Sequence, residues 1–164
     1  MRTTVNVRMC LVIACLAVFS LAAVWAAGTP GEGDLAIVVN PDNPVNNLTL
    51  AELRQIYLGE RQYWRASSPA LVLMRSRGSR EREVILRVVF QMTEQRYTQY
   101  WVAKVMRAEA SDPPASLFSY GMVEEGVRGN PGAIGYVYLN DVRPGVKVVR
   151  IGGLLPGEPS YPLR

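Results

Sequence analysis

Four arginines crowd the point where a short apolar run becomes an amphipathic helix: Arg75, Arg77, Arg80 and Arg82. The first turn of a helix carries the positive end of the helix dipole, so cations there are disfavoured by roughly 0.3–1 kcal/mol each at a surface. Two interpretations follow. Either carboxylates of the chain offset this cost, or an anion binds at the start of the helix.

The anion interpretation rests on donors that lie close together in the sequence. A strand, a short Gly/Ser turn and a helix form the arrangement that aims free backbone amides at an anion. Arginine forks and serine hydroxyls complete the donor types that hold phosphate and related oxyanions. The predicted ligand-binding residues are Arg75, Ser76, Gly78, Ser79 and Arg80. Within this group Ser79 is the expected helix cap, and Gly78 supplies a flexible turn.

Acidic residues of the same stretch support the alternative, in which no ligand binds. Glu81 and Glu83 lie in the same first turn. Arg80–Glu83 and Glu83–Arg87 have the spacings of three and four residues that suit ion pairs along a helix. Such pairs are common on solvated surfaces, and Ser79 is then an ordinary cap.

The residue types that catalysis or metal binding would need are scarce. The sequence holds no histidine, and its two cysteines, Cys10 and Cys15, lie near the N-terminus. Glu124 and Glu125 are adjacent, so on a helix they point about 100° apart and cannot form a tight acid/base pair. We therefore expect no enzyme, no cofactor and no metal site.

The first residues have the pattern of a secretory signal peptide. Arg2 and Arg8 precede an uncharged apolar run over 9–24, and small residues follow it, which predicts cleavage after Ala26 and export to the periplasm. An uncleaved anchor is the alternative. Removing 26 of the 164 residues leaves 138, the size of one domain with its own core. The arginines lost with the signal reduce the net charge from +4 to +2, which is too slight to indicate nucleic-acid binding.

Strands are predicted to alternate with helices in the rest of the chain. After a linker over 27–34, apolar runs predict strands at 35–40, 70–74, 133–139 and 146–151. Helical periodicity predicts helices that begin at Thr49, with a capping box to Glu52, near Ser79 and at Thr93, and a shorter one over 116–128. The expected fold is an α/β layered domain over 35–151, with a mostly parallel sheet flanked by helices and an irregular tail over 152–164.

Aromatic and glycine residues add two expectations about packing. Most tyrosines and tryptophans fall at core spacing on helices, whereas Trp64 leads a polar loop and is the aromatic best placed for exposure. Gly135 lies inside a predicted strand, which indicates a close approach of another segment to the backbone.

Three stretches together resemble the phosphate-binding periplasmic proteins of ABC transporters, which have the type 2 periplasmic binding protein fold. They are "LTLAELRQIYLGERQYW", "RSRGSRE" after a strand, and "NPGAIGYVYL". The resemblance implies one lobe of that fold, with phosphate held by Arg75, by Ser79 and by the amides that follow in the turn shaped by Gly78. This chain departs from the family where it has Arg77 in place of aspartate and Arg80 and Glu81 in place of glycine and threonine.

The resemblance also implies a function. A chain of this size matches a single lobe, whereas the family's transport proteins close two lobes over the ligand. We expect an exported, periplasmic solute-binding protein for phosphate or a related oxyanion, linked to phosphate uptake or sensing. A single lobe is then expected to bind weakly, or to need a second copy or an envelope partner to complete the cleft. The alternative is a degenerate lobe that acts as a protein-interaction module for an envelope sensor, a porin or a transporter.

Overall fold

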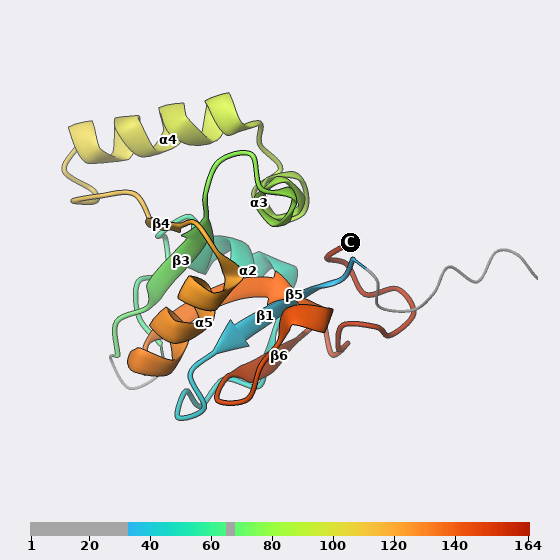
Figure 1. The fold of residues 1–164 in the computed structure, drawn as a ribbon. Coiled ribbons are helices and arrows are strands. Elements are labelled where there is room, and N and C mark those ends of the chain that lie inside the picture. Colours follow the sequence, from blue (N-terminus) through green and yellow to red (C-terminus); the bar gives the residue numbers. More distant parts are fainter. Residues whose placement is uncertain (1–32, 65–67) are drawn as a thin grey trace, which may run out of the picture. The chain divides into compact units, whose positions relative to one another are not determined.

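The computed structural model describes residues 33–64 and 68–164 of the chain (Figure 1). The predicted signal peptide and most of the predicted linker lie outside the described residues. Contacts group all of the described residues into one unit. Within the described part, every helix is too short or too polar to cross a membrane.

Strands and helices are interspersed along the chain. The strands are β1 (Leu35–Val39), β2 (Asn47–Leu48), β3 (Leu71–Arg75), β4 (Ala115–Leu117), β5 (Ala133–Tyr138) and β6 (Lys147–Ile151). The helices are α2 (Leu50–Tyr57), α3 (Arg80–Ile85), α4 (Glu94–Met106) and α5 (Tyr120–Gly129). A π-helical segment, η2 (Leu86–Phe90), continues α3 directly, and a 3₁₀ turn, η3 (Leu139–Asp141), follows β5. The predicted alternation is not strict, because β1 is followed directly by β2, and α3 and η2 by α4.

The six described strands form one sheet in the order β2-β6-β1-β5-β3-β4. β1 runs antiparallel to both of its neighbours, β5 and β6, whereas the β2–β6, β3–β5 and β3–β4 pairs are parallel. Five strands therefore run in one direction and β1 runs against them. The predicted α/β domain with a mostly parallel sheet is confirmed.

The helix starts follow the predicted capping chemistry. Thr49 and Glu52 form the complete capping box of α2. Ser79 caps α3, and Thr93 caps α4; each hydroxyl accepts a hydrogen bond from the backbone amide three residues on. These side chains satisfy amides that have no partner inside the helix.

The prediction of a helix over 116–128 is wrong in its first part. Residues Ala115–Leu117 pair with β3 as the edge strand β4, and the helix begins only after the cap at Ser119. Helical periodicity in this segment competes with a free sheet edge, and the backbone hydrogen bonds of that edge prevail. The two-residue strand β2 is a further element that the sequence pattern does not predict.

The core lies on both faces of the sheet. Along β1, Leu35, Ile37 and Val39 point to the cluster that includes α2 and η2, and the alternate residues Ala36 and Val38 point to the cluster under α5. This alternation follows from the period of two in a strand. Figure 1 shows α5 on one face of the sheet and α2 on the other.

Two close approaches in the core involve the stretch "NPGAIGYVYL". A Cβ added to Gly135 would lie 2.5 Å from Val123 Cγ1, so α5 packs directly on the backbone of β5, as predicted. The prediction that Trp64 is exposed is wrong, because this residue is only 4% exposed. Its indole Nε1 donates a hydrogen bond of 2.8 Å to the carbonyl of Gly132, which gives the polar edge of the ring a buried partner.

The tail after β6 consists of turns, yet it takes part in the core. Tyr161 and Leu163 are buried, and the Leu163 carbonyl accepts a hydrogen bond of 2.8 Å from the Leu35 amide. The Tyr161 hydroxyl donates to the Leu35 carbonyl at 2.7 Å. The tail thus fixes the start of β1.

Candidate functional site

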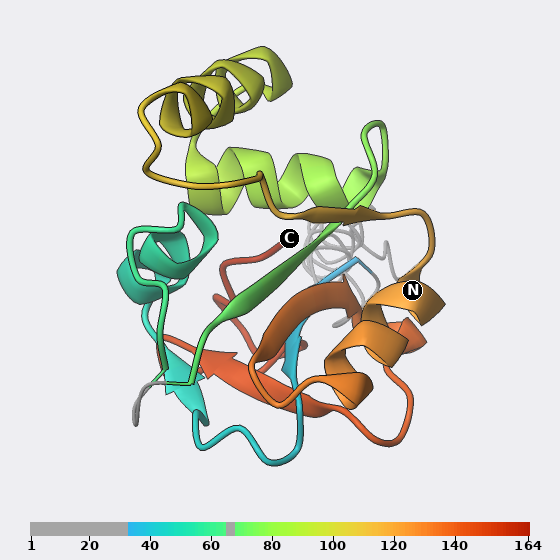
Figure 2. The same cartoon turned by 90° about the vertical axis from the view of Figure 1, so that its left-hand side faces the viewer.

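The carboxyl ends of three parallel strands meet at one edge of the sheet. β4, β3 and β5 lie side by side in that order and end at Leu117, Arg75 and Tyr138. Ligands of open α/β sheets commonly bind outside this edge. In Figure 2 the green strand β3 leads to the tight loop that precedes α3. That loop contains the predicted anion-binding residues.

Arg75 is held between two partners of the same chain. Its Nε lies 3.3 Å from Glu81 Oε1, and its Nη1 donates a hydrogen bond of 3.0 Å to the carbonyl of Leu117. The side chains of Arg75 and Glu81 are only 11% and 10% exposed, so both charges are largely removed from water. The carboxylate of Glu81 is thus the counter-ion of the predicted phosphate-binding arginine.

The turn after Arg75 is built as predicted. Gly78 has a φ of 78°, a left-handed conformation that favours glycine. The Ser79 hydroxyl accepts a hydrogen bond from the Arg82 amide at 3.3 Å, and the Ser76 amide donates to the Leu117 carbonyl at 2.9 Å. The structure therefore brings Arg75, Ser76, Gly78 and Ser79 together at the end of β3. Arg80 follows in the first turn of α3 and is exposed.

Two further arginines share one carboxylate, that of Glu94 at the start of α4. Arg82 is buried, and its Nε and Nη2 donate to the two oxygens of Glu94 at 2.7 and 2.9 Å. Arg77 Nε donates to Oε1 of the same residue at 2.9 Å, and its Nη2 donates to the Thr98 hydroxyl. The expected pairs along α3 are therefore not the main ones. Sequence reasoning missed Glu94 because it belongs to a different helix.

The contact between Arg82 and Glu94 determines the charge states of both side chains. Burial alone lowers the pKa of Arg82, but the hydrogen bond to Glu94 and its charge outweigh burial, so the pKa lies above its usual value. The hydrogen bond from Arg82, aided by the charges of Arg82 and Arg77, holds the pKa of Glu94 below its usual value against a smaller effect of burial. Both groups are ionised at neutral pH. Two cations and one anion leave one positive charge at this place.

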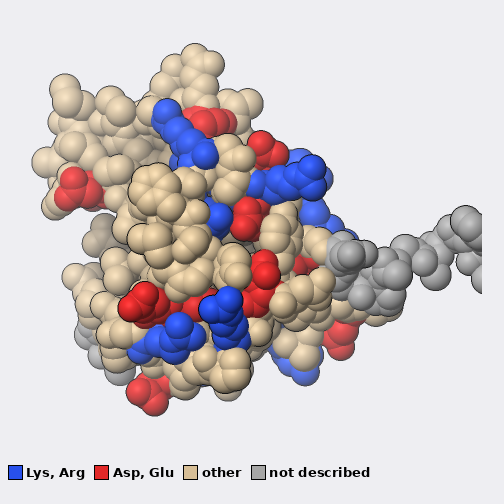
Figure 3. Space-filling model, viewed as in Figure 1, with Lys and Arg blue, Asp and Glu red and all other residues tan. Residues whose placement is uncertain are grey.

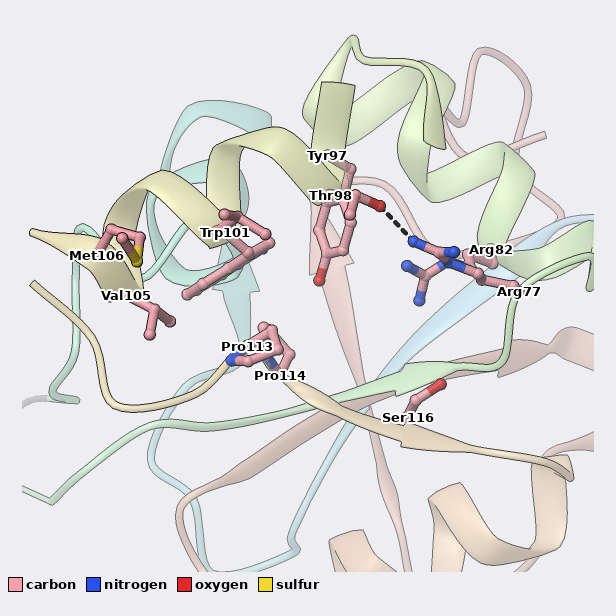
Figure 4. A pocket seen from close by; sticks show the side chains of 11 residues that line it. Arg77, Arg82, Tyr97, Thr98, Trp101, Val105, Met106, Pro113, Pro114 and Ser116 are labelled. Carbon is pink, nitrogen blue, oxygen red and sulfur yellow. Dashed lines mark hydrogen bonds between the residues drawn. The ribbon is translucent and has the colours of Figure 1, made fainter. Parts of the chain in front are cut away.

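A groove opens beside the shared carboxylate, between α4 and the segment that enters β4 (Figure 4). Its volume is about 400 Å³. Arg77, Arg82 and Thr98 lie at one end of the groove, whereas its other end is apolar. The apolar end is lined by Trp101, Val102, Val105, Met106, Pro113 and Pro114.

On the face shown in Figure 3, the charged side chains form no single basic patch, because lysine and arginine side chains lie next to aspartate and glutamate side chains. Among residues 33–64 and 68–164 there is no group of three or more histidine, cysteine, aspartate or glutamate side chains that could hold a metal ion. Arg75, Arg77 and Arg82 carry guanidinium groups, which suit the recognition of anions.

Comparisons with known proteins agree with this architecture. Similar solved structures include a putative phosphate ABC transporter substrate-binding protein with bound phosphate from Clostridium perfringens, with 24% identity and a TM-score of 0.62 over 75% of this chain and 46% of that one. An ABC-type phosphate transport receptor from Vibrio cholerae has 23% identity and a TM-score of 0.62, over 79% of this chain and 50% of that one. PstS from Borrelia burgdorferi has 19% identity and a TM-score of 0.60, over 79% of this chain and 53% of that one.

At these identities the likeness concerns the fold, and this chain spans about half the length of the proteins that it matches. The family profile adds a direct assignment, because the PBP superfamily domain matches residues 31–156. The resemblance found in the sequence is confirmed: the chain belongs to the PBP superfamily.

Proposed function

We propose that this protein is an exported, periplasmic solute-binding lobe that takes phosphate or a related oxyanion at the carboxyl edge of β3, in a role linked to phosphate uptake or sensing. The proposed contacts are the side chains of Arg75, Ser76, Ser79 and Arg80 and the backbone amides around Gly78. The observation that carries the proposal is the position of the Arg75 guanidinium beside the capped turn, where three parallel strands end.

Two further facts support an oxyanion as the ligand. The chain belongs to the PBP superfamily, and its structural relative from Clostridium perfringens holds a bound phosphate. Arginine and serine donors at the carboxyl edge of a sheet also suit the geometry and the charge of a tetrahedral oxyanion.

Glu81 competes with an incoming anion for the guanidinium of Arg75. Its carboxylate pairs with Arg75 at 3.3 Å, so an incoming anion must displace it or share the guanidinium with it. The exposed Arg80 sits next to Glu81 in the first turn and offers a second cation. We therefore expect weaker binding than in a site without an internal carboxylate.

A second candidate function is a protein-interaction module. Phe118 follows β4 directly and is 78% exposed, and Met122, in the first turn of α5, is also exposed. These apolar side chains lie on the segment that leaves the carboxyl edge of β4. Apolar residues there suit the docking of an envelope partner, or of a second copy that completes the cleft.

The experiment is an anion titration of the purified protein in phosphate-free buffer at constant ionic strength. A ligand that binds only the folded state stabilises it by about 2.7 kcal/mol at 100 times its dissociation constant, which raises the Tm by several degrees. We expect phosphate to raise the Tm, and Glu81→Gln to lower the phosphate concentration needed. Glu83→Gln is the matched control, because it removes an exposed carboxylate from the same helix.

The outcomes separate the two candidate functions. A phosphate response that is strengthened in Glu81→Gln and unchanged in Glu83→Gln supports the oxyanion site. The absence of any response in all three proteins contradicts it and favours the interaction module. Mass spectrometry of the protein recovered from the periplasmic fraction tests the proposed cleavage after Ala26.

A further inference from the structure

We propose that the groove beside α4 binds a small amphipathic carboxylate, with its apolar tail between α4 and the Pro113–Pro114 segment and its carboxylate at Arg77. This site is separate from the proposed oxyanion site, because the Arg75 guanidinium is turned to Glu81 and Leu117 and does not line the groove.

The first observation is the way in which α4 is attached to the rest of the lobe. Near its start, Tyr97 packs edge to face on Phe90 with 5.0 Å between the ring centres. Further along, the Lys104 ammonium and the Tyr100 hydroxyl donate to the Leu58 carbonyl at 2.7 and 2.9 Å. These contacts fix one side of the helix. They do not cover the side of the helix that faces Pro113 and Pro114 across the groove.

That remaining side is apolar and uncovered. Val105 and Met106 lie three and four residues after Val102, and these spacings place both of them beside Val102 on one stripe of the helix. Val102 is 57% exposed and Met106 is 83% exposed. In Figure 4, Trp101, Val105 and Met106 project from α4 toward the space above the two prolines. An apolar tail in this space covers the stripe and gains the free energy of removing it from water.

The second observation is the charge at the other end of the groove. Arg77 and Arg82 share the single carboxylate of Glu94, and no acidic residue is among the described residues that line the groove. The hydrogen bonds of Arg82 use Nε, Nη1 and Nη2. Those of Arg77 within the described chain use only Nε and Nη2. Arg77 therefore retains donors, and the local excess of positive charge favours an anionic group.

The shape of the groove favours a small molecule over a large partner. A volume of about 400 Å³ lies within the range of roughly 300–1,000 Å³ that is typical of small-molecule sites. Walls on two sides, with one apolar end and one cationic end, suit a ligand that has a tail and a single anionic head. Burial raises the pKa of Tyr97 to about 12, so the phenol on the wall between the two ends stays protonated at neutral pH.

The test uses octanoate, 1-octanol and acetate as probes in isothermal titration calorimetry of the whole protein. Octanoate has both the tail and the head, whereas each of the others has only one of them. We expect octanoate to bind about tenfold more tightly than octanol, which corresponds to one charge-assisted contact, and acetate to show no binding. Equal affinities of octanoate and octanol would contradict the role of Arg77, and no binding of either would contradict the site.

Variants then locate the head and the tail. Arg77→Gln should remove the preference for octanoate over octanol, and Arg77→Lys should restore part of it. Arg96→Gln is the matched control, because it removes an exposed cation of α4 that lies outside the groove. Val105→Asp should abolish the binding of both probes. An equal loss in Arg77→Gln and Arg96→Gln would overturn the proposed head position.

Two further measurements separate the groove from the oxyanion site and from a contact between copies of the chain. Phosphate titration of Val105→Asp should match that of the unmodified protein, since Val105 lines the groove and lies outside the turn of the proposed oxyanion site. Light scattering tests whether a second copy covers the groove. A dimer that Met106→Glu dissociates, together with no octanoate binding, would replace the small-molecule proposal by a self-association surface.

Discussion

The arginines at the end of β3 and after it divide between two environments. At the carboxyl edge, Arg75 meets one carboxylate, that of Glu81, and both side chains are largely buried. At the groove, Arg77 and Arg82 meet one carboxylate between them, and apolar side chains at the other end of the groove are exposed. The first region balances its charges within the chain. The second has a spare positive charge and an uncovered apolar surface.

This difference separates structural charge from charge that is available to a ligand. An external anion must displace Glu81 from Arg75 or share the guanidinium with it, so we expect Glu81 to lower the affinity of the proposed oxyanion site. Arg77 shares the carboxylate of Glu94 with Arg82, so an external anion can bind Arg77 without displacing a counter-ion that Arg77 has to itself. Arg77 and Glu81, two of the three positions at which the sequence is expected to depart from the family's pattern, belong one to each environment.

The largest expected effect comes from breaking the balanced pair. Arg75→Ala leaves Glu81 buried without its partner and removes the hydrogen bond to Leu117, so we expect a loss of about 3 kcal/mol in the free energy of unfolding, at the low end for a buried pair. Arg80→Ala, at the exposed neighbour, should change it by less than about 0.5 kcal/mol. Urea denaturation of both variants measures the difference.

A double variant tests the cause of that loss. In Arg75→Ala/Glu81→Gln the orphaned charge is gone, so part of the stability should return relative to Arg75→Ala alone. Similar small losses for Arg75→Ala and Arg80→Ala would mean that the pair is not balanced within the fold, and the contrast between the two regions would fail.

Much of the fold could be predicted because its signals are local. The capping box of Thr49 and Glu52, the cap at Ser79 and the apolar run of β1 each depend on residues within a few positions of one another. The edge strand β4 could not be predicted in this way. Its three residues become a strand because β3 lies beside them, and that pairing joins segments about forty residues apart.

The candidate site shows the same limit. The turn from Arg75 to Ser79 is local, and the sequence predicts its cap and its glycine. The partners of the arginines are only partly local: Glu81 lies in the same stretch, whereas Glu94 comes from the next helix and Leu117 from the neighbouring strand. The burial of Trp64 escapes sequence reasoning for the same reason, because the carbonyl that receives its indole NH belongs to Gly132.

A middle-sized effect is expected from the shared carboxylate, and it depends on pH. The pKa of Glu94 lies below its ordinary value of 4.5 in the folded state. A lowered pKa contributes stability above the unfolded-state pKa, and this contribution is lost as the pH falls through the folded-state pKa. The advantage of the unmodified protein over Glu94→Gln should therefore be full at pH 7 and shrink below about pH 4.5.

Thermal unfolding of both proteins between pH 7 and pH 3 measures this advantage. Glu109→Gln serves as the comparison, because its pKa is also lowered, by the hydrogen bond from Arg107, but both side chains of that pair are well exposed. We expect a smaller difference there, since solvent screens the pair. An advantage of Glu94 that does not change with pH would show that its charge is not what holds the two arginines.

The smallest expected effect concerns the uncovered stripe of α4. If Val102 and Met106 await a ligand, truncating them in the ligand-free protein removes little packing, so Val102→Ala and Met106→Ala should each cost less than about 0.5 kcal/mol. Tyr97→Ala, at a buried position of the same helix, should cost about 3 kcal/mol.

The stripe variants should have a clear effect only when the ligand is present. With saturating octanoate, Val102→Ala and Met106→Ala should both reduce the increase in Tm that the ligand produces, whereas Arg96→Gln should leave that increase unchanged. A loss above about 1.5 kcal/mol for either stripe variant without ligand would mean that the stripe is already packed within the folded protein. The groove would then be part of the core, and the distinction between a balanced region and an available one would no longer hold.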